Sequence, residues 1–343
     1  MNHSTPAREA TLRDTTITPT VDFDREGTQH GFLKLPYSSD QSAWGCIMIP
    51  VTVVKNGDGP TALLTGGNHG DEYEGITALL KLTQTLKAEE IQGRVIIVPA
   101  MNYPAVCSGT RTSPIDKGNM NRAFPGDPQG SITERIADYF QRYLIPLCDY
   151  ALDIHSGGKT LDFIPFSAAH RLPDKEQEAR CIEGARCFGT PATMIMFELD
   201  ADSLYDTAVE SQGKVFVTTE LRGGGTTTPD SMRLADTGVS NFLKFAGILP
   251  GKPELPDAPV MQLDMPDASC YVISTHKGIL ELTRNLGDTV NKGDLIARIH
   301  PLERTGTEPA EYHAQRSGVL AARRYPALAD MGDTLAVIAD LIP

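Results

Sequence analysis

The sequence lacks any long apolar segment. None of its stretches approaches the roughly 18 consecutive apolar residues of a membrane-spanning helix. Residues 1–20 also lack the apolar core of a secretory signal peptide. We therefore expect a cytoplasmic protein that does not have a membrane as its partner.

An excess of positive charge is absent as well. The chain has 31 Lys and Arg residues against 44 Asp and Glu residues, so its formal net charge is −13. Nucleic-acid binding needs a basic surface that neutralises phosphates, and we therefore exclude nucleic acid as a partner. The six cysteines contain no C-x-x-C pair, and a disulfide framework is not expected in a chain of this size.

The chain does have the composition of a globular protein with a substantial core. Hydrophobic residues make up 40% and charged residues 22% of its 343 positions. This length suits one large domain together with a smaller one. We place the main domain at residues 1–250, with a polar N-terminal arm at 1–25, followed by a linker at 251–259 and a second domain at 260–343.

Short apolar runs alternate with helical patterns through the main domain. Each run precedes a glycine-rich or polar loop, as a buried strand does. The predicted strands lie within residues 45–57, 61–67, 93–102, 150–158 and 214–225. Helical patterns follow the second strand and recur within residues 132–147 and 231–249. This alternation predicts an α/β fold with helices on both faces of a mostly parallel sheet.

The character of the sequence changes after residue 249. Residues 250–259 contain four prolines, which is typical of a linker. Beyond them, the stretches GDTVNKGDLIARI and ADMGDTLAVI are similar to each other and to the half-repeats of a lipoyl- or biotinyl-type β-barrel. The lysine that such carriers modify does not follow Ile299. We therefore predict a structural or lid-forming barrel and not a swinging-arm carrier.

Four candidate functional residues come directly after predicted strands. His69 and Glu72 follow the second strand, His155 ends the fourth and Glu220 ends the fifth. Ligands of open α/β sheets bind outside the carboxyl ends of the strands. We therefore expect these side chains to meet at one edge of the sheet.

Imidazole and carboxylate are the ligands of a catalytic zinc ion, which takes three of them and keeps one position open. His69 and Glu72 can both face one ion if the chain turns tightly, which Gly66, Gly67 and Gly70 permit. The distant second histidine completes the set, and the remaining glutamate could act as a base. Alone, H-x-x-E is more often a charged surface turn, and His₂Glu also suits other divalent metals.

A loop at residues 108–126 holds two further candidates, Arg111 and Arg122. A guanidinium beside a zinc site can polarise a carbonyl or bind a carboxylate with two hydrogen bonds. Two solvated loop arginines are the alternative interpretation.

Five stretches, in this order, carry a resemblance to a known family: NHGDEYEG, NYPAVCSGTR, GNMNRAFPG, DIHSGG and TTELRGGG. They are similar to the ordered motifs of the succinylglutamate desuccinylase/aspartoacylase family, which shares the zinc-carboxypeptidase fold. The resemblance covers about residues 45–225, and the C-terminal β-barrel is also typical of the family. It implies a mixed, mostly parallel sheet with helices on both faces, and it makes residues 1–250 a catalytic zinc-hydrolase domain.

The resemblance also implies a role for each candidate residue. One zinc ion per chain would be held by His69, Glu72 and His155, and Glu220 would be the general base. The residues that would contact the substrate are Arg111 at the oxyanion and Asn121 with Arg122 at the α-carboxylate.

Asn119 departs from the family pattern, because D-x-N-R commonly places an aspartate there as a partner of a zinc histidine. An amide can accept a hydrogen bond from the imidazole but brings no charge. The form GNMNRAFPG, the barrel and the overall length look more like the N-acetyl-2,4-diaminobutyrate deacetylases of ectoine breakdown. The implied reaction is hydrolysis of an N-acyl amino acid.

Other activities stay open at this point. An aspartoacylase or desuccinylase needs extra cationic groups, and Lys159, Arg222 and Lys117 stand close in sequence. A zinc carboxypeptidase would use the same residues on peptides, and a non-catalytic binding protein is a remote alternative. A homodimer is expected only because such dimers are common.

A substrate that carries an ammonium group would need an acidic partner in the site. The segment 196–206 offers four carboxylates before the fifth strand: Glu198, Asp200, Asp202 and Asp206. A solvated acidic loop is the alternative interpretation of this segment.

Overall fold

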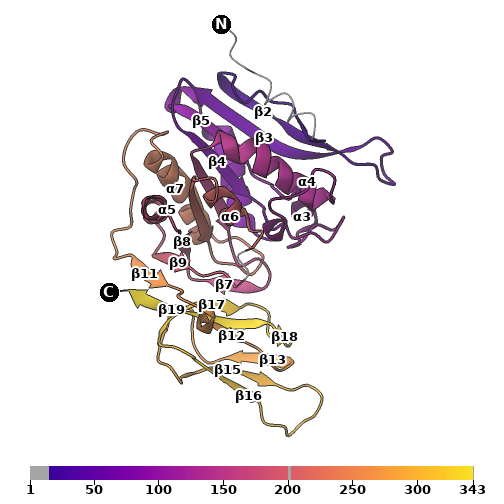
Figure 1. Cartoon of the computed structure of the whole chain (residues 1–343). Coiled ribbons are helices and arrows are strands. Elements are labelled where there is room, and N and C mark those ends of the chain that lie inside the picture. The colour runs from indigo at the N-terminus through magenta and orange to yellow at the C-terminus, as the bar shows by residue number, and fades with distance from the viewer. Residues whose placement is uncertain (1–14, 200–201, 343) are drawn as a thin grey trace.

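The computed structural model describes residues 15–199 and 202–342, which form an α/β body with a β-rich lobe at the C-terminal end (Figure 1). One mixed sheet runs through the body. Its strands in spatial order are β1 (Thr18–Pro19), β2 (Gly27–Pro36), β3 (Cys46–Asn56), β5 (Gly93–Val98), β4 (Thr61–Gly66), β6 (Tyr150–His155), β10 (Val215–Glu220), β8 (Phe166–His170) and β9 (Ala192–Met196).

The central strands of this sheet pair in parallel. β5, β4, β6 and β10 are neighbours joined only by parallel ladders. β8 then pairs with β10 in the antiparallel sense, and β9 pairs in parallel with β8. The predicted mixed, mostly parallel sheet is confirmed, and the strands that precede His69, His155 and Glu220 lie side by side at its centre.

Helices cover both faces of the sheet, as predicted. They are α2 (Tyr73–Thr85), α3 (Tyr103–Ser108), α4 (Ile132–Tyr139), α5 (Lys175–Phe188), α6 (Tyr205–Glu210) and α7 (Pro229–Phe245). The helix predicted over residues 132–147 is α4 continued by a π-helical turn and a 3₁₀ turn, Phe140–Leu144 and Ile145–Leu147.

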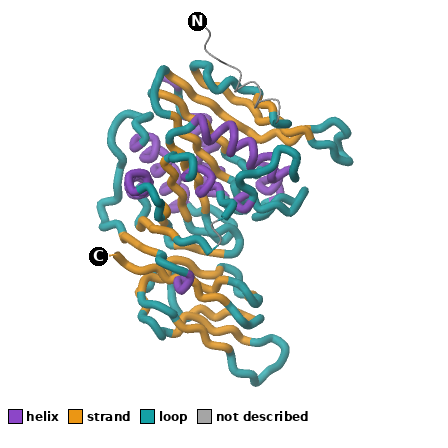
Figure 2. Tube along the Cα trace, viewed as in Figure 1, coloured by secondary structure: helices purple, strands orange, loops and turns teal. Residues whose placement is uncertain are grey.

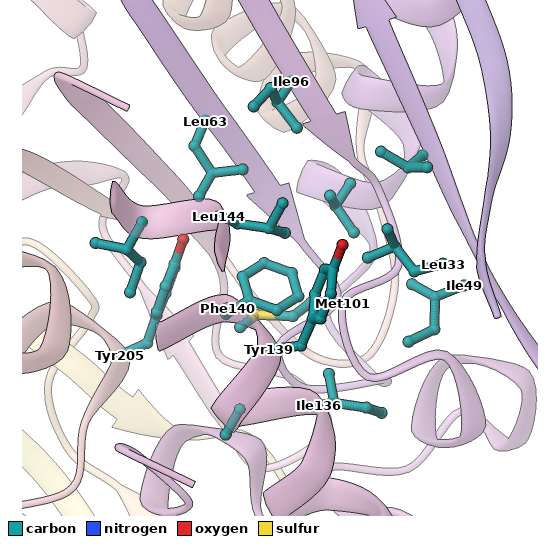
Figure 3. Close-up of a cluster of buried hydrophobic side chains, with 14 of the residues drawn as sticks. Leu33, Ile49, Leu63, Ile96, Met101, Ile136, Tyr139, Phe140, Leu144 and Tyr205 are labelled. Atoms are coloured by element: carbon teal, nitrogen blue, oxygen red, sulfur yellow. The ribbon is translucent and has the colours of Figure 1, made fainter. Parts of the chain in front are cut away.

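The two faces follow from the alternation of side chains along a strand. In β4, Leu63 packs with α4 and α6 in one core cluster, whereas Leu64 packs with α2, α5 and α7 in the other. Figure 3 shows the first cluster, where Phe140 and Tyr205 lie beneath Leu63. Each fully buried side chain of this size contributes about 1.5–3 kcal/mol, so the two clusters hold the central strands firmly in place.

Part of the predicted N-terminal arm belongs to the sheet. Residues 1–14 lie outside the described part, but β1 pairs with β2, and Ile17 and Val21 are buried. These two apolar side chains anchor a stretch that is otherwise polar.

The C-terminal lobe consists of two small antiparallel sheets (Figure 2). The first contains β11 (Met261–Asp264), β12 (Tyr271–Ile273), β14 (Thr289–Val290), β17 (Gly318–Arg324) and β19 (Thr334–Ile342). The second contains β13 (Gly278–Leu282), β15 (Leu295–His300), β16 (Ala310–His313) and β18 (Leu328–Ala329).

The lobe is joined to the body by backbone hydrogen bonds. β11 pairs in parallel with β9, and β17 pairs with β7 (Leu161–Phe163), which follows directly after β6. The first small sheet therefore continues the central sheet. Among the helices of the described residues, none is long and apolar enough to cross a membrane.

Candidate active site

Three adjacent strands bring the candidate residues to one edge of the sheet. In the parallel ladders, Gly66 at the end of β4 lies opposite Ile154, and His155 lies opposite Glu220. The strands therefore end at the same level. All four side chains line one cavity of about 170 Å³. They therefore lie together at one edge of the sheet, as predicted.

The turn after β4 depends on two glycines. Gly67 has φ +66°, in the left-handed region that side chains disfavour. Gly70 lies against the backbone of Ala105, where a Cβ would be 2.0 Å from a carbonyl carbon, and its N–H donates to Thr110 O over 3.0 Å. The predicted role of these glycines in turning His69 back towards the site is confirmed.

His69, Glu72 and His155 converge as a buried group. The two oxygens of Glu72 lie 2.7 Å from Nδ1 of His69 and 2.8 Å from Nδ1 of His155. The donor atoms of the three residues are all within 4.8 Å of one another. Both imidazoles direct Nδ1 towards the carboxylate of Glu72. Two imidazole nitrogens and one carboxylate in this arrangement fit a divalent metal ion.

The electrostatics suit such an ion. Burial works to raise the pKa of Glu72, but the two histidines outweigh it and hold this pKa below its ordinary value. Burial lowers the pKa of His69. Glu72 is therefore an anion and His69 an uncharged ring, which are the forms that bind a metal. Burial works to lower the pKa of His155, but Asp153 and Glu72 outweigh it and raise this pKa well above its ordinary value, so a metal ion would have to displace a proton from this ring.

Both histidines are held from behind. Nε2 of His69 lies 3.1 Å from Oδ1 of Asn119, so the predicted amide partner is in place. Nε2 of His155 lies 2.7 Å from Oδ2 of Asp153, which the sequence-based interpretation missed. The signal was present, because Asp153 and His155 are two apart in a strand and share a face. Thr65 and Asn68 fix this aspartate with hydrogen bonds of 2.7 and 2.9 Å.

Asp153→Asn is expected to weaken metal binding by about 10- to 100-fold, because the anionic partner that orients His155 and raises its basicity is lost. Competition with a chromophoric chelator measures the affinity. Asn119→Ala is the matched comparison, since it removes an uncharged partner from the other histidine and should cost less. Equal affinity in Asp153→Asn and the unmodified protein would contradict this role.

Glu220 has the properties of a proton carrier. It lines the cavity, and its Oε2 has no hydrogen-bond partner among the described residues. Burial raises the pKa of Glu220 well above its ordinary value, and the charge of Glu72 adds to the rise. Such a carboxylate takes up a proton more readily than one in water.

The loop before α4 supplies the cationic side of the cavity. Nη1 of Arg111 lies 3.3 Å from Nδ1 of His69 and 3.4 Å from Glu72 Oε1, although 49% of the side chain is exposed. Arg122 donates to the backbone oxygen of Asn121 over 2.7 Å, and Asn121 accepts from the N–H of Tyr205 over 3.0 Å. All three predicted substrate-contact residues line the cavity.

The acidic segment divides between the cavity and the surface. Glu198 and Asp206 line the cavity, Asp202 is exposed, and Asp200 lies outside the described residues. The cations that a second substrate carboxylate would need are engaged elsewhere. Lys159 bonds to Gly109 O, and Arg222 lies 3.5 Å from Asp162. Lys117, the third candidate, is not among the residues that line the cavity.

Sequence spacing gave no sign of a second group of metal-binding residue types. His170 on β8 lies 3.0 Å from Glu210 and 3.7 Å from Asp206, both on α6. Burial works to lower the pKa of His170, but Glu210 and Asp206 outweigh it and raise this pKa to about 9. The ring is therefore protonated at neutral pH, and we interpret the group as a buried ion-pair cluster.

His170→Gln is expected to flatten the pH dependence of stability. A histidine whose pKa is raised on folding stabilises the fold fully below about pH 6.5, and this contribution is lost as pH rises through about 9. The rise corresponds to about 3 kcal/mol. Urea unfolding at pH 6.5 and 9.5 measures it. The groups facing the ring are Glu210, Asp206 and Glu198, and a variant with the same pH slope as the unmodified protein would refute the cluster's role.

The C-terminal lobe forms part of the wall beside the site. A neighbouring cavity of about 290 Å³ shares Arg111, Arg122 and Glu220 with the first and is closed on the other side by Tyr271 and Ala322. The histidines of the lobe stay away from the site, since His276 contacts Tyr312 and His300 contacts Glu281. The lobe therefore contributes apolar side chains as well as Tyr271 and Thr334, but no histidine, to this wall.

Comparisons with known proteins agree with this arrangement. The family model of the succinylglutamate desuccinylase/aspartoacylase catalytic domain matches residues 58–246. The chain is 62% identical over 330 residues to the N-alpha-acetyl-L-2,4-diaminobutyric acid deacetylase of Halomonas elongata, covering 96% of each protein.

Solved structures are similar over nearly the whole chain. The product-bound ectoine utilization protein EutE (DoeB) from Ruegeria pomeroyi is 54% identical, with a TM-score of 0.93 over 95% of this chain and 99% of that one. A succinylglutamate desuccinylase/aspartoacylase from Rhodobacter sphaeroides is 37% identical, with a TM-score of 0.91 over 96% and 100%. The chain belongs to the succinylglutamate desuccinylase/aspartoacylase family.

Proposed function

We propose that this protein is a zinc-dependent amidohydrolase that removes the acyl group from an N-acyl amino acid. The substrate is N-acetyl-L-2,4-diaminobutyrate, which yields acetate and diaminobutyrate in ectoine degradation. The observation that carries the proposal is that the metal-binding group, the arginines and Glu220 all line the same cavity. The name of the relative from Halomonas elongata supports the choice of substrate.

His69, Glu72 and His155 would hold one zinc ion per chain. A zinc ion there would polarise the acyl carbonyl and lower the pKa of a water molecule towards about 7. Zinc is preferred because His₂Glu with an open position is a common catalytic zinc set, although other divalent metals accept the same ligands.

The side chains of the cavity perform the remaining work. Arg122 and Asn121 bind the α-carboxylate and orient the amide, while Arg111 faces the carbonyl oxygen and stabilises the negative charge that develops on it. Glu220 accepts a proton as water oxygen attacks the carbonyl carbon. The C–N bond then breaks, and Glu220 returns that proton to the leaving nitrogen.

The shape and charge of the cavity support a small substrate. Its volume of about 170 Å³ suits a small substrate, and a neighbouring cavity of about 290 Å³ shares part of its wall. Arg111 and Arg122 are the only Lys or Arg side chains among the described residues that line it. A second substrate carboxylate, as in N-acetyl-aspartate or N-succinyl-glutamate, would lack a cation of its own.

A substrate panel tests the function. N-α-acetyl-diaminobutyrate, N-acetyl-aspartate, N-succinyl-glutamate and a dipeptide are compared by kcat/KM, together with the zinc content of the purified protein. The proposal expects the first substrate to give the highest value and one zinc per chain. A higher value for any other member, or no hydrolysis by the zinc-loaded protein, would refute it.

We also propose the division into a catalytic domain at residues 1–250, a linker at 251–259 and a β domain at 260–343. The absence of helix and strand from residues 250–260, which are described throughout, supports this boundary. A cytoplasmic location and a homodimer stay predictions.

A further inference from the structure

Glu198 is a carboxylate in the catalytic cavity that the proposed reaction does not use. It comes two residues after the end of β9 and lines the same cavity as Glu220 and Arg122. It also borders two neighbouring cavities, one of them towards the C-terminal lobe. Its side chain therefore faces the space in which a substrate is held.

Only burial and the charges of other residues act on this carboxylate, and no hydrogen bond from a described residue contributes to its pKa. Asp206, the other carboxylate of the segment in the cavity, is already engaged by the N–H of Thr207 and by His170 at 3.7 Å. Burial raises the pKa of Glu198 and the charge of Asp206 raises it further, and together they outweigh His170, Arg122 and His155, which lower it. Glu198 is half-buried, and because its pKa stays raised despite the cations around it, a further cation in direct contact would be favourable.

The charges of the cavity are arranged for a substrate with three distinct groups. Arg122 suits the α-carboxylate, and the metal-binding group with Arg111 suits the acyl carbonyl. Glu72 and Glu220 are assigned to the metal and to the proton. Among the described carboxylates of the cavity, Glu198 is thus the one with no hydrogen bond or ion pair to a described residue and no task in the proposed reaction, although His170, Arg122 and His155 act on it as cations from a distance.

We infer that Glu198 binds a side-chain ammonium group of the substrate and so selects N-acylated diamino acids over acyl amino acids with neutral or acidic side chains. This inference rests on the proposed function and names the specificity-determining group of the same site. A charge-assisted hydrogen bond from the ammonium supplies the missing partner. Asp206 adds to the negative potential at this end of the cavity.

The C-terminal lobe holds this residue in place. The hydroxyl of Tyr271 donates to the backbone oxygen of Phe197 over 2.9 Å, and β9 is fixed by its pairing with β11. The chain directly before Glu198 is therefore anchored, which limits the freedom of its carboxylate and lowers the entropic cost of binding an ammonium.

The test compares two substrates that have the same shape. N-α-acetyl-diaminobutyrate carries an ammonium where N-α-acetyl-norvaline carries a methyl group. The ratio of kcat/KM for the charged over the neutral substrate is measured in the unmodified zinc-loaded enzyme and in Glu198→Gln. This ratio should fall by about 10- to 100-fold in the variant, chiefly through the KM of the charged substrate.

Asp202→Asn is the matched control, since it removes one negative charge from an exposed position of the same segment. Its ratio should stay within about twofold of that of the unmodified enzyme, because exposed charges are screened. An unchanged ratio in Glu198→Gln, or an equal fall in both variants, would overturn the inference and leave the deacylase function standing. If the unmodified enzyme hydrolyses neither substrate, the proposed function itself fails.

Discussion

Glu220→Gln should lower kcat by about 10³-fold, the middle of the range for a general base, while the protein keeps its metal and its fold. The amide has the size of the carboxylate but cannot accept a proton from water. Among the described residues, no hydrogen bond joins Glu220 to His69, Glu72 or His155. The metal content should therefore be unchanged. The variant should also be no less stable, because a buried charge with an unpartnered oxygen is removed.

Steady-state kinetics with N-α-acetyl-diaminobutyrate, elemental analysis and thermal unfolding check these three expectations. Glu198→Gln is the matched comparison, because it makes the same change in the same cavity but should shift the preference between substrates. A Glu220→Gln enzyme within about tenfold of the unmodified kcat would show that another group moves the proton.

His69→Ala should abolish metal binding at micromolar metal and with it all measurable hydrolysis. Loss of a group behind a ligand costs about 10- to 100-fold in metal affinity, and loss of the ligand itself must cost more. His69 is 2% exposed, and its two ring nitrogens lie beside polar groups of the site, Glu72 and Asn119. Alanine therefore leaves a polar space that water can fill, and the fold should persist.

Equilibrium dialysis against buffered zinc, with circular dichroism as the check on folding, measures this outcome. His276→Ala is the control, because this exposed histidine of the C-terminal lobe lies outside the cavity. It should retain one metal ion per chain. A folded His69→Ala protein that binds zinc as tightly as the control would refute the assignment of the ligands.

Much of the site was predictable because it follows from local rules. Strands that end in His155 and Glu220 need only be parallel neighbours for those side chains to meet, and their register places them opposite each other. The turn at His69 was readable from its glycines. The alternation of side chains along a strand also predicts that Asp153 and His155 share a face. Asp153 was missed because it lies inside β6 and not at its carboxyl end, where ligand-binding residues are expected.

The remaining features depend on contacts between segments far apart in the chain. His170 meets Glu210 only because the short helix α6 packs beside β8, and no spacing in the sequence records that packing. The prolines of residues 250–259 correctly indicated a break in regular structure. They could not reveal that β11 then returns to pair with β9, because such pairing is decided by long-range register.

The pairing of β11 with β9 also has a consequence for solubility. Without the C-terminal lobe, β9 would end the central sheet with a row of unpaired N–H and C=O groups, open to strand addition by another copy. Instead, β11, β19 and β17 extend the sheet outward from that position. The lobe thus covers β9, which would otherwise be an exposed edge strand prone to aggregation.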